Sequence, residues 1–235
     1  MATANVVGVL WAAAMFAWFF ISALYMQLVL GWSALQVGLA FLPSNLIMAA
    51  FSLGLSARIV MRFGIRRPLA LGLLLAAAGL ALFARAPLEG SLVADVLPGM
   101  LLLGLGAGIA FNPLLLAAMS DVKPEDSGLA SGVVNTAFMM GGALGLAALA
   151  SLASARTSAA LAAMDIPVPA VALNEGYHAA FIVGALFAAA AGGVGAVFMR
   201  SPVPASGPAV DSVPASVPGP VSAAGSEAQS FTAPP

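Results

Sequence analysis

The stretch Met1–Ala57 reads MATANVVGVLWAAAMFAWFFISALYMQLVLGWSALQVGLAFLPSNLIMAAFSLGLSA and contains no charged side chain; the first is Arg58. A bilayer core takes roughly 20 helical residues, so this run is too long for one membrane crossing and long enough for two. Gly31-Trp32-Ser33 interrupts the run near its middle, which predicts a hairpin of two spanning helices. A soluble core does not bury so much uninterrupted apolar surface, and the sequence therefore indicates an integral membrane protein.

The composition of the whole chain points to the same class. Hydrophobic residues make up 62% of the 235 residues and charged residues 7%, whereas soluble domains carry about 25% charged residues. A net charge of −1 gives no reason to expect a nucleic acid partner, and the lack of cysteine excludes disulfides and thiol catalysis. The N-terminus has no positive region and the apolar run is longer than a signal core, so we expect no cleaved signal peptide.

We predict an all-α membrane protein with a six-helix transmembrane domain over residues 1–200. The expected spans are 6–30, 34–57, 68–83, 96–119, 127–153 and 179–199. The segment 154–177 is expected to be the longest external loop, with an extended stretch at Ile166–Pro169. Residues 201–235 are mostly Pro, Ser, Ala, Val and Gly, which predicts a disordered cytoplasmic tail.

The basic residues are distributed unequally between the two sides of these spans. One side carries Arg85 and Arg156, and the other carries Arg58, Arg62, Arg66, Arg67, Lys123 and Arg200. Because Lys and Arg accumulate on the cytoplasmic side of membrane proteins, we expect both termini in the cytoplasm. The loop between the second and third spans, which is rich in arginine, should lie there too, and the chain should lie in the cell membrane.

Small residues four positions apart recur in the last three spans, and such spacing lets helices approach closely in lipid. The pairs are Gly104 with Gly108, Gly128 with Gly132, Gly141 with Gly145, and Gly184 with Ala188. We expect these residues to pack the bundle.

Three asparagines fall within the predicted spans: Asn45, Asn112 and Asn135. An amide in hydrocarbon is costly unless it is paired or wetted. Ser127, Ser131 and Asn135 follow one another at a spacing of four, which places them on one stripe of a helix. Two interpretations remain open: these residues line a polar cavity, or they form hydrogen bonds between neighbouring helices.

Pro43 and Pro113 lie inside the second and fourth spans, where each removes a backbone hydrogen bond and bends its helix. Bent helices beside polar groups recur in transporters. The sequence also contains a weak internal repeat, since Gly38-Leu39-Ala40 precedes Asn45 at the spacing at which Gly128-Leu129-Ala130 precedes Asn135. A three-plus-three inverted repeat would produce this pattern.

The sequence offers little catalytic chemistry. His178 is the single histidine and lies beside Tyr177 at a predicted membrane boundary, so no second histidine or cysteine can join it at a metal. A Gly-x-Ser-x-Gly elbow and a phosphate-binding loop are also absent. Asp95, three residues before Pro98, is predicted either to cap the fourth span or to contact a proton or substrate. We expect no enzyme, no cofactor and no metal.

Four motifs together resemble the major facilitator superfamily. Met61-Arg62-Phe63-Gly64-Ile65-Arg66-Arg67-Pro68 resembles its Asp-Arg-x-Gly-Arg-Arg signature, which lies between the second and third spans of a six-helix half. Gly128–Asn135 followed by Gly141–Gly145 resembles the penultimate span of its fourteen-spanner drug:proton antiporters. Asp95–Gly99 and Gly176–Phe181 are similar to that family's entries into the preceding and final spans. The resemblance covers about residues 6–200.

Two positions depart from the family pattern. The family usually has an acid where this chain has Met61, which weakens the charge network expected at the gate. The family often has Arg-Gln where this chain has Phe138-Met139, which makes that wall of the cavity more apolar and removes a cation.

The resemblance implies the C-terminal half of a transporter that exports small hydrophobic or drug-like compounds, driven by protons. Its partners would be the lipid bilayer and a second six-helix half, or a second copy of the chain. Alternatively, the chain is a truncated non-transporting membrane protein or an assembly partner; an intramembrane enzyme ranks third. Candidates for the substrate cavity are Asn45, Asn112, Ser131, Asn135 and Met139, and candidates for the gating loop are Arg62, Gly64 and Arg66.

Overall fold

The computed structural model describes residues 2–120 and 122–198, and every regular element in that part of the chain is helical. Arg200 and the predicted tail lie outside the described residues. The helices are α1 (Ala2–Leu24), α2 (Ala34–Ala50), α3 (Ser56–Phe63), α4 (Arg66–Phe83), α5 (Leu97–Met119), α6 (Ser127–Ala162) and α7 (Pro169–Phe198). Wider π-helical turns at Tyr25–Val29, Phe51–Leu55 and Leu92–Val96 extend three of them, and a 3₁₀ turn covers Pro124–Asp126.

The prediction of six membrane-spanning helices is confirmed for the described part of the chain. Six helical stretches there are long and apolar enough to cross a bilayer: Thr3–Val29, Ala34–Leu55, Arg66–Phe83, Leu92–Met119, Ser127–Ala162 and Pro169–Phe198. The π turns belong to three of these spans, because each one continues a helix without a break in the winding.

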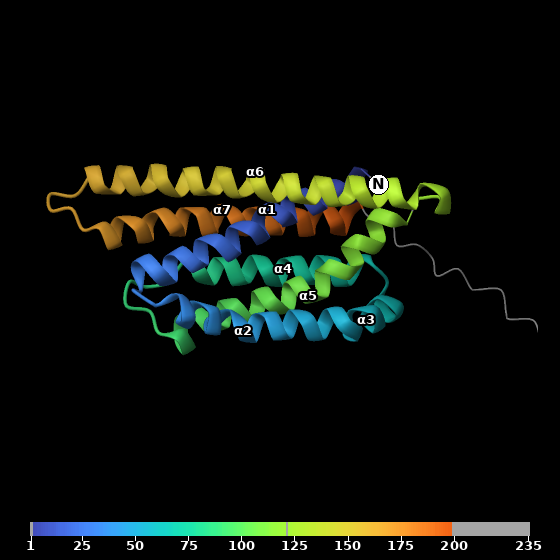
Figure 1. Ribbon diagram of the computed structural model, residues 1–235, viewed down its shortest axis with the longest axis horizontal. Coiled ribbons are helices and arrows are strands. Elements are labelled where there is room, and N and C mark those ends of the chain that lie inside the picture. Colours follow the sequence, from blue (N-terminus) through green and yellow to red (C-terminus); the bar gives the residue numbers. More distant parts are fainter. Residues whose placement is uncertain (1, 121, 199–235) are drawn as a thin grey trace, which may run out of the picture. The chain divides into compact units, whose positions relative to one another are not determined.

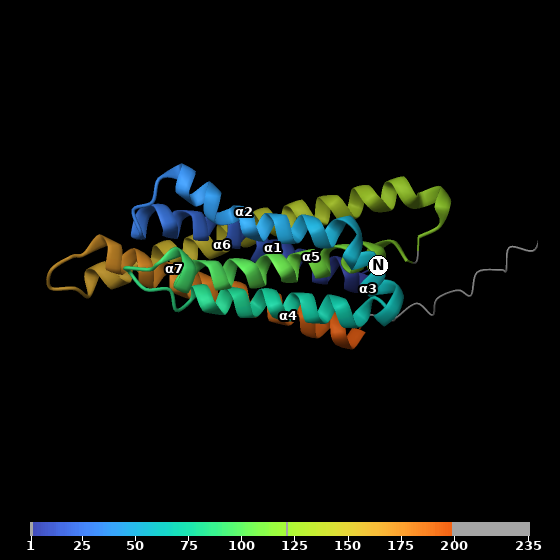
Figure 2. The ribbon, with the colours of Figure 1, turned by 90° about the horizontal axis from the view of Figure 1, so that it is seen from below.

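Successive spans run in opposite directions, so the connections alternate between the two ends of the bundle (Figure 1). One end, here called the basic end, carries the N-terminus, α3 and the α5–α6 connection. The other, here called the distal end, carries the α1–α2, α4–α5 and α6–α7 connections. Figure 2 shows the same arrangement from below, with α4 lying beside α7 and α2 beside α5.

The break in the first apolar run forms the expected hairpin. Gly31 adopts a φ of 71°, a left-handed conformation that favours glycine. Ser33 then caps α2: its backbone N–H donates to Gln36 Oε1 at 2.8 Å, and the Gln36 N–H donates to Ser33 Oγ at 3.4 Å. This reciprocal capping box starts the second span immediately after the turn.

The segment that carries the arginines is more helical than predicted. The helix that carries the second span does not end at residue 57 but continues through α3 to Phe63. Gly64, with φ 74°, ends it, and α4 begins at Arg66. The predicted loop is thus a turn of two residues, with Arg62 in the last turn of one helix and Arg66 at the start of the next.

The expectation of a long external loop over residues 154–177 is wrong. Helix α6 continues to Ala162 and α7 begins at Pro169, which leaves only residues 163–168 as a connection. The continuation of α6 is rich in alanine, the best helix former, and a proline is well tolerated in the first turn of a helix. The α6–α7 hairpin consequently extends beyond the other two distal connections (Figures 1 and 2).

The core of the bundle lies between α1, α4, α5 and α7. Helix α1 packs on α6 and α7, α4 packs on α5 and α7, and α2 packs on α5. In an apolar stretch of 18 residues from each span, 56% is buried in α1 and in α5, whereas only 17% is buried in α2 and in α6. Helices α2 and α6 therefore form the least covered sides of this unit.

The expected packing role holds for some of the small residues and not for others. A Cβ added at Gly145 would meet the Cβ of Ala13 on α1, and one added at Gly141 would meet Val9 at 2.8 Å. Gly104 contacts the backbone of Ser44 on α2 in the same close way. In contrast, Gly128 and Gly132 have no atom within 4 Å of the added Cβ, so the start of α6 is not packed through its glycines.

This difference predicts opposite effects of the same substitution on one helix. Gly145→Ala overpacks the α1–α6 contact and should destabilise the protein by about 1–3 kcal/mol. Gly132→Ala adds a methyl group in open space and should stabilise the helix by up to about 1 kcal/mol, since alanine loses less entropy than glycine. Thermal unfolding of both variants in the same detergent tests this, and equal melting temperatures would contradict the packing described here.

Candidate functional site

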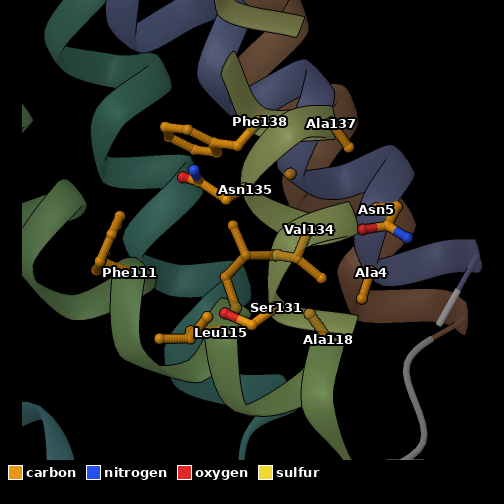
Figure 3. Close-up of a pocket in the computed structure, with 12 residues that line it drawn as sticks. Ala4, Asn5, Phe111, Leu115, Ala118, Ser131, Val134, Asn135, Ala137 and Phe138 are labelled. Carbon is orange, nitrogen blue, oxygen red and sulfur yellow. The ribbon is translucent and has the colours of Figure 1, made fainter. Parts of the chain in front are cut away.

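A cavity of about 270 Å³ opens between α1, α5 and α6 near the basic end (Figure 3). It is lined by Ala4, Asn5, Gly8, Phe111, Leu114, Leu115, Ala118, Ser131, Val134, Asn135, Ala137 and Phe138. The lining is apolar except for two amides and one hydroxyl, and none of these residues carries a charge.

Two of the predicted cavity residues, Ser131 and Asn135, come to this cavity from α6. They are one turn apart and face Phe111 and Leu115 of α5 (Figure 3). Within the described part of the chain, neither side chain forms a hydrogen bond to another residue, so both polar groups are available to a ligand or to water. Ser127, the first residue of the predicted stripe, does not line the cavity.

Asn5 supplies the second amide, from the first turns of α1. Sequence reasoning missed this residue because it places the start of the first span at Val6, whereas the span begins at Thr3. Asn5 could have been proposed as a cavity residue because it is an amide at the edge of a long apolar run.

The apolar part of the wall is partly aromatic. The Phe138 ring meets Phe111 edge-on, with centroids 6.3 Å apart and planes at 88°. It also lies 6.3 Å from the Phe16 ring of α1, at 71°. Edge-to-face contacts of this kind are favourable. Phe138 of α6 therefore contacts aromatic rings of both α1 and α5 beside the cavity. It stands at the position where the family often has a cation.

The other predicted cavity residues lie elsewhere. Asn112 Nδ2 donates to the carbonyl oxygen of Ser52 at 3.1 Å, within the π turn Phe51–Leu55 of the second span. A π turn leaves carbonyl groups without their usual helical donor, so Asn112 joins α5 to the second span. Asn45 is half-buried on α2 and Met139 is exposed on α6, and neither lines this cavity.

The gating-loop candidates cluster at the basic end, outside the cavity lining. Arg62 and Arg66 are exposed on either side of the Gly64 turn. The Arg62 guanidinium lies 5.6 Å from the centroid of the Phe63 ring. Near the C-terminus of α3, the positive charge of Arg62 interacts favourably with the helix dipole.

Asp95 lies at the distal end, far from the cavity. Its Oδ2 accepts a hydrogen bond from the Ser91 N–H at 2.8 Å, while Ser91 Oγ accepts one from the Ala94 N–H at 3.2 Å. The cap of the fourth span is therefore Ser91, and Asp95 completes it from the first turn. Asp95 precedes Phe111 by 16 residues of helix, or about 24 Å.

His178 and two other side chains anchor the α4–α5 connection. His178 Nε2 and Ala86 O form a hydrogen bond of 2.8 Å, and Asn174 Nδ2 donates to the same carbonyl at 3.4 Å. Tyr25 donates its hydroxyl proton to Pro87 O at 2.6 Å. The lone histidine thus fixes α7 against this connection, a role that its place in the sequence did not reveal.

The chemistry of the cavity is that of binding. Among the described residues there is no group of three His, Cys, Asp or Glu side chains that could hold a metal ion. The cavity lining itself contains no titratable residue. Amides and a hydroxyl on an aromatic and aliphatic wall can hold an uncharged, largely apolar compound and orient it by hydrogen bonds.

Six helices long and apolar enough to span a membrane define a polytopic membrane protein. The chain belongs to the Major Facilitator Superfamily, whose family model matches residues 4–146, more than half of the sequence.

Several curated relatives are resistance or export proteins. The chain is 36% identical over 179 residues to the puromycin resistance protein pur8 of Streptomyces alboniger, covering 73% of this chain and 35% of that protein. It is 35% identical over 141 residues to the cephamycin export protein CmcT of Amycolatopsis lactamdurans, covering 60% and 29%. It is 36% identical over 149 residues to the lincomycin resistance protein of Streptomyces lincolnensis, covering 63% and 31%. The chain therefore spans about a third of the length of these relatives.

Proposed function

We propose that this chain is the C-terminal six-helix half of an efflux transporter for small, largely apolar compounds. The observation that carries the proposal is the cavity between α1, α5 and α6, whose uncharged walls combine Asn5, Ser131 and Asn135 with aromatic rings. Its relatives named for drug resistance and antibiotic export support the same function. In the cell membrane, the basic end with its arginines lies in the cytoplasm.

Proton coupling requires an ionisable group that senses the bound compound. The described cavity lining offers none, and Asp95 is engaged by Ser91 at the opposite end of α5. We therefore assign the coupling acid to a second six-helix half, across the cavity from this one.

The least buried helices support the need for a second half. Helix α2 exposes Leu35, Leu39 and Leu46, which suit lipid or a protein partner equally well. Helix α6 exposes Ser131 and Asn135 together with Met140, and this mixture of polar and apolar groups is poorly suited to lipid. A separately encoded N-terminal half, or a second copy of the chain, would cover the α6 face and enclose the cavity.

A cysteine at position 135 tests whether the cavity is wet and holds substrate. The natural chain has no cysteine, so Asn135→Cys introduces a single thiol. We expect it to react with a water-soluble thiol reagent in folded protein, and a transported compound should slow the reaction.

Leu144→Cys provides a matched control on the same helix. Leu144 is exposed, at 68%, and lies nine residues after Asn135, which at 100° per residue is half a turn around the helix. That thiol faces the opposite side and should stay unreactive. Equal rates of thiol modification at positions 135 and 144, or an unreactive thiol in Asn135→Cys, would show that Asn135 packs against other helices. Either result would contradict the assignment of the cavity as the binding site.

The second candidate function is a non-transporting assembly partner. The observation in its favour is that the described lining of the cavity carries no ionisable group that could couple transport to a proton. A transporter half would show substrate protection at position 135 when its partner is present, and an assembly partner would show none.

A further inference from the structure

A second cavity, of about 240 Å³, lies at the other end of α6, between α1, α6 and α7. Its lining is Phe20, Ile21, Leu24, Ala150, Ala153, Ser154, Thr157, Ser158, Leu173 and Tyr177. It shares no residue with the first cavity, so it is a separate site.

The position of this cavity along α6 places it at the membrane surface. Ala150 and Ser158 follow Ser127, the first residue of the helix, by 23 and 31 positions. At about 1.5 Å per residue they lie about 35 and 47 Å from that end, whereas Phe20 on α1 follows Thr3, where its span begins, by 17 positions, or about 26 Å. Against a hydrocarbon core of about 30 Å, the cavity therefore lies across the distal boundary between the hydrocarbon core and the headgroups, where tyrosines such as Tyr177 are frequent.

One side of the cavity presents hydroxyl groups. Ser154 and Ser158 are one turn apart on α6 and form no hydrogen bond within the described part of the chain. Thr157, by comparison, donates to the carbonyl of Ala153 at 2.9 Å, the usual bond of a hydroxyl to its own helix. The two serines are thus free to bind a ligand.

The opposite side is apolar and the cavity carries no charge. Phe20, Leu24 and Leu173 form the wall that faces the serines. Because no lining residue is ionisable at neutral pH, a charged headgroup would lose its hydration without gaining a counter-charge. The chemistry fits an uncharged polar group attached to an apolar body.

The contacts of α7 hold this cavity open in one shape. Asn174 and His178 hydrogen-bond to the α4–α5 connection, while Leu173 and Tyr177, each one position earlier, line the cavity. Gly176 contacts Thr157 and Ala153 of α6 so closely that no side chain would fit there. The helix is therefore fixed in register, and the site is formed before a ligand arrives.

We propose that this distal cavity binds an uncharged amphiphile, with hydroxyl or carbonyl groups on Ser154 and Ser158 and an apolar body against Phe20 and Leu24. Two sources have this chemistry: a neutral glycerolipid of the surrounding leaflet and an exported compound on its way out. The experiment below distinguishes them.

The test uses the full chain in lipid nanodiscs and a monoacylglycerol that carries a photoactivatable diazirine in its acyl chain. After illumination, mass spectrometry should map the label to residues 20–24 and 173–177. Each hydrogen bond contributes about 1 kcal/mol, or roughly fivefold in affinity, so the double variant Ser154→Ala/Ser158→Ala should reduce labelling roughly tenfold or more. Ser151→Ala, an exposed serine of α6 outside the lining, is the control and should not change it.

Competition between the labelled monoacylglycerol and unlabelled compounds distinguishes the two sources of the bound amphiphile. Displacement of the label by unlabelled diacylglycerol supports a lipid site, and displacement by an uncharged fluorescent dye without an acyl chain supports an exit site for an exported compound. Leu24→Trp, which fills the cavity, should abolish labelling in either case. Labelling that falls equally on lipid-facing Leu144 and Leu186, or that persists undiminished in the double serine variant, would overturn the proposal.

Discussion

Liposomes that contain this chain as their sole protein should show no proton-driven transport of a fluorescent apolar dye. The cavity has walls from α1, α5 and α6, and its described lining contains no carboxylate; under the proposed function, a second half is needed to enclose a compound and to couple its movement to a proton. Alternating access needs one bundle to rock against another around a fixed site. An imposed pH gradient with a fluorescence readout measures this, and empty liposomes set the background.

Addition of the missing half is the positive control for this experiment. The same liposomes, prepared with a second six-helix half, should transport the dye and lose transport when the gradient is collapsed. Gradient-dependent transport by the chain alone, at the rate of the completed complex, would contradict the interpretation of the cavity as one wall of a larger site.

A second large effect is expected from substitution of Gly64, in the turn between α3 and α4. Gly64 has φ 74° and ψ −176°, a conformation that costs a residue with a side chain about 1–3 kcal/mol. Gly64→Val should therefore destabilise the folded protein by about 1–3 kcal/mol, and in the completed transporter it should reduce the transport rate because the turn must rearrange to relieve the strain. Arg62→Ala, which removes the charge beside the end of α3, should also reduce it, by a smaller factor.

Arg85→Ala is the matched control for the arginine. Arg85 is also exposed at the end of a span, but at the distal end, outside the turn. It should leave transport nearly unchanged. Equal losses of transport rate in Arg62→Ala and Arg85→Ala would indicate that these arginines determine only the orientation of the chain in the membrane.

The six spans were predictable because lipid selects for long apolar helices, and the chain offers six runs of that kind. The end of α6 was not predictable on this basis. Hydropathy predicts that a helix stops where the hydrocarbon stops, whereas α6 continues to Ala162 through a segment whose alanines favour helix in water as well. Hydropathy locates the membrane, and helix propensity decides where the helix ends.

The cavity was predictable only in part. The four-residue spacing of Ser131 and Asn135 placed both on one helix face, and both line the cavity. Asn112 resembled them in sequence, but the π turn at Phe51–Leu55 presents it with a backbone acceptor. No spacing rule signals such a turn, and none shows that Asn5, far away in the sequence, meets the same cavity.

The central claim is that a functional transporter contains this chain and a second six-helix half. Native mass spectrometry of particles extracted from the membrane in polymer discs, with transport measured on the same preparation, tests it most directly. We expect every transporting particle to contain this six-helix domain together with a second one, and therefore to have a mass well above the 23.3 kDa of the chain described here. A transporting particle that contains a single copy of this chain and no other protein would contradict it.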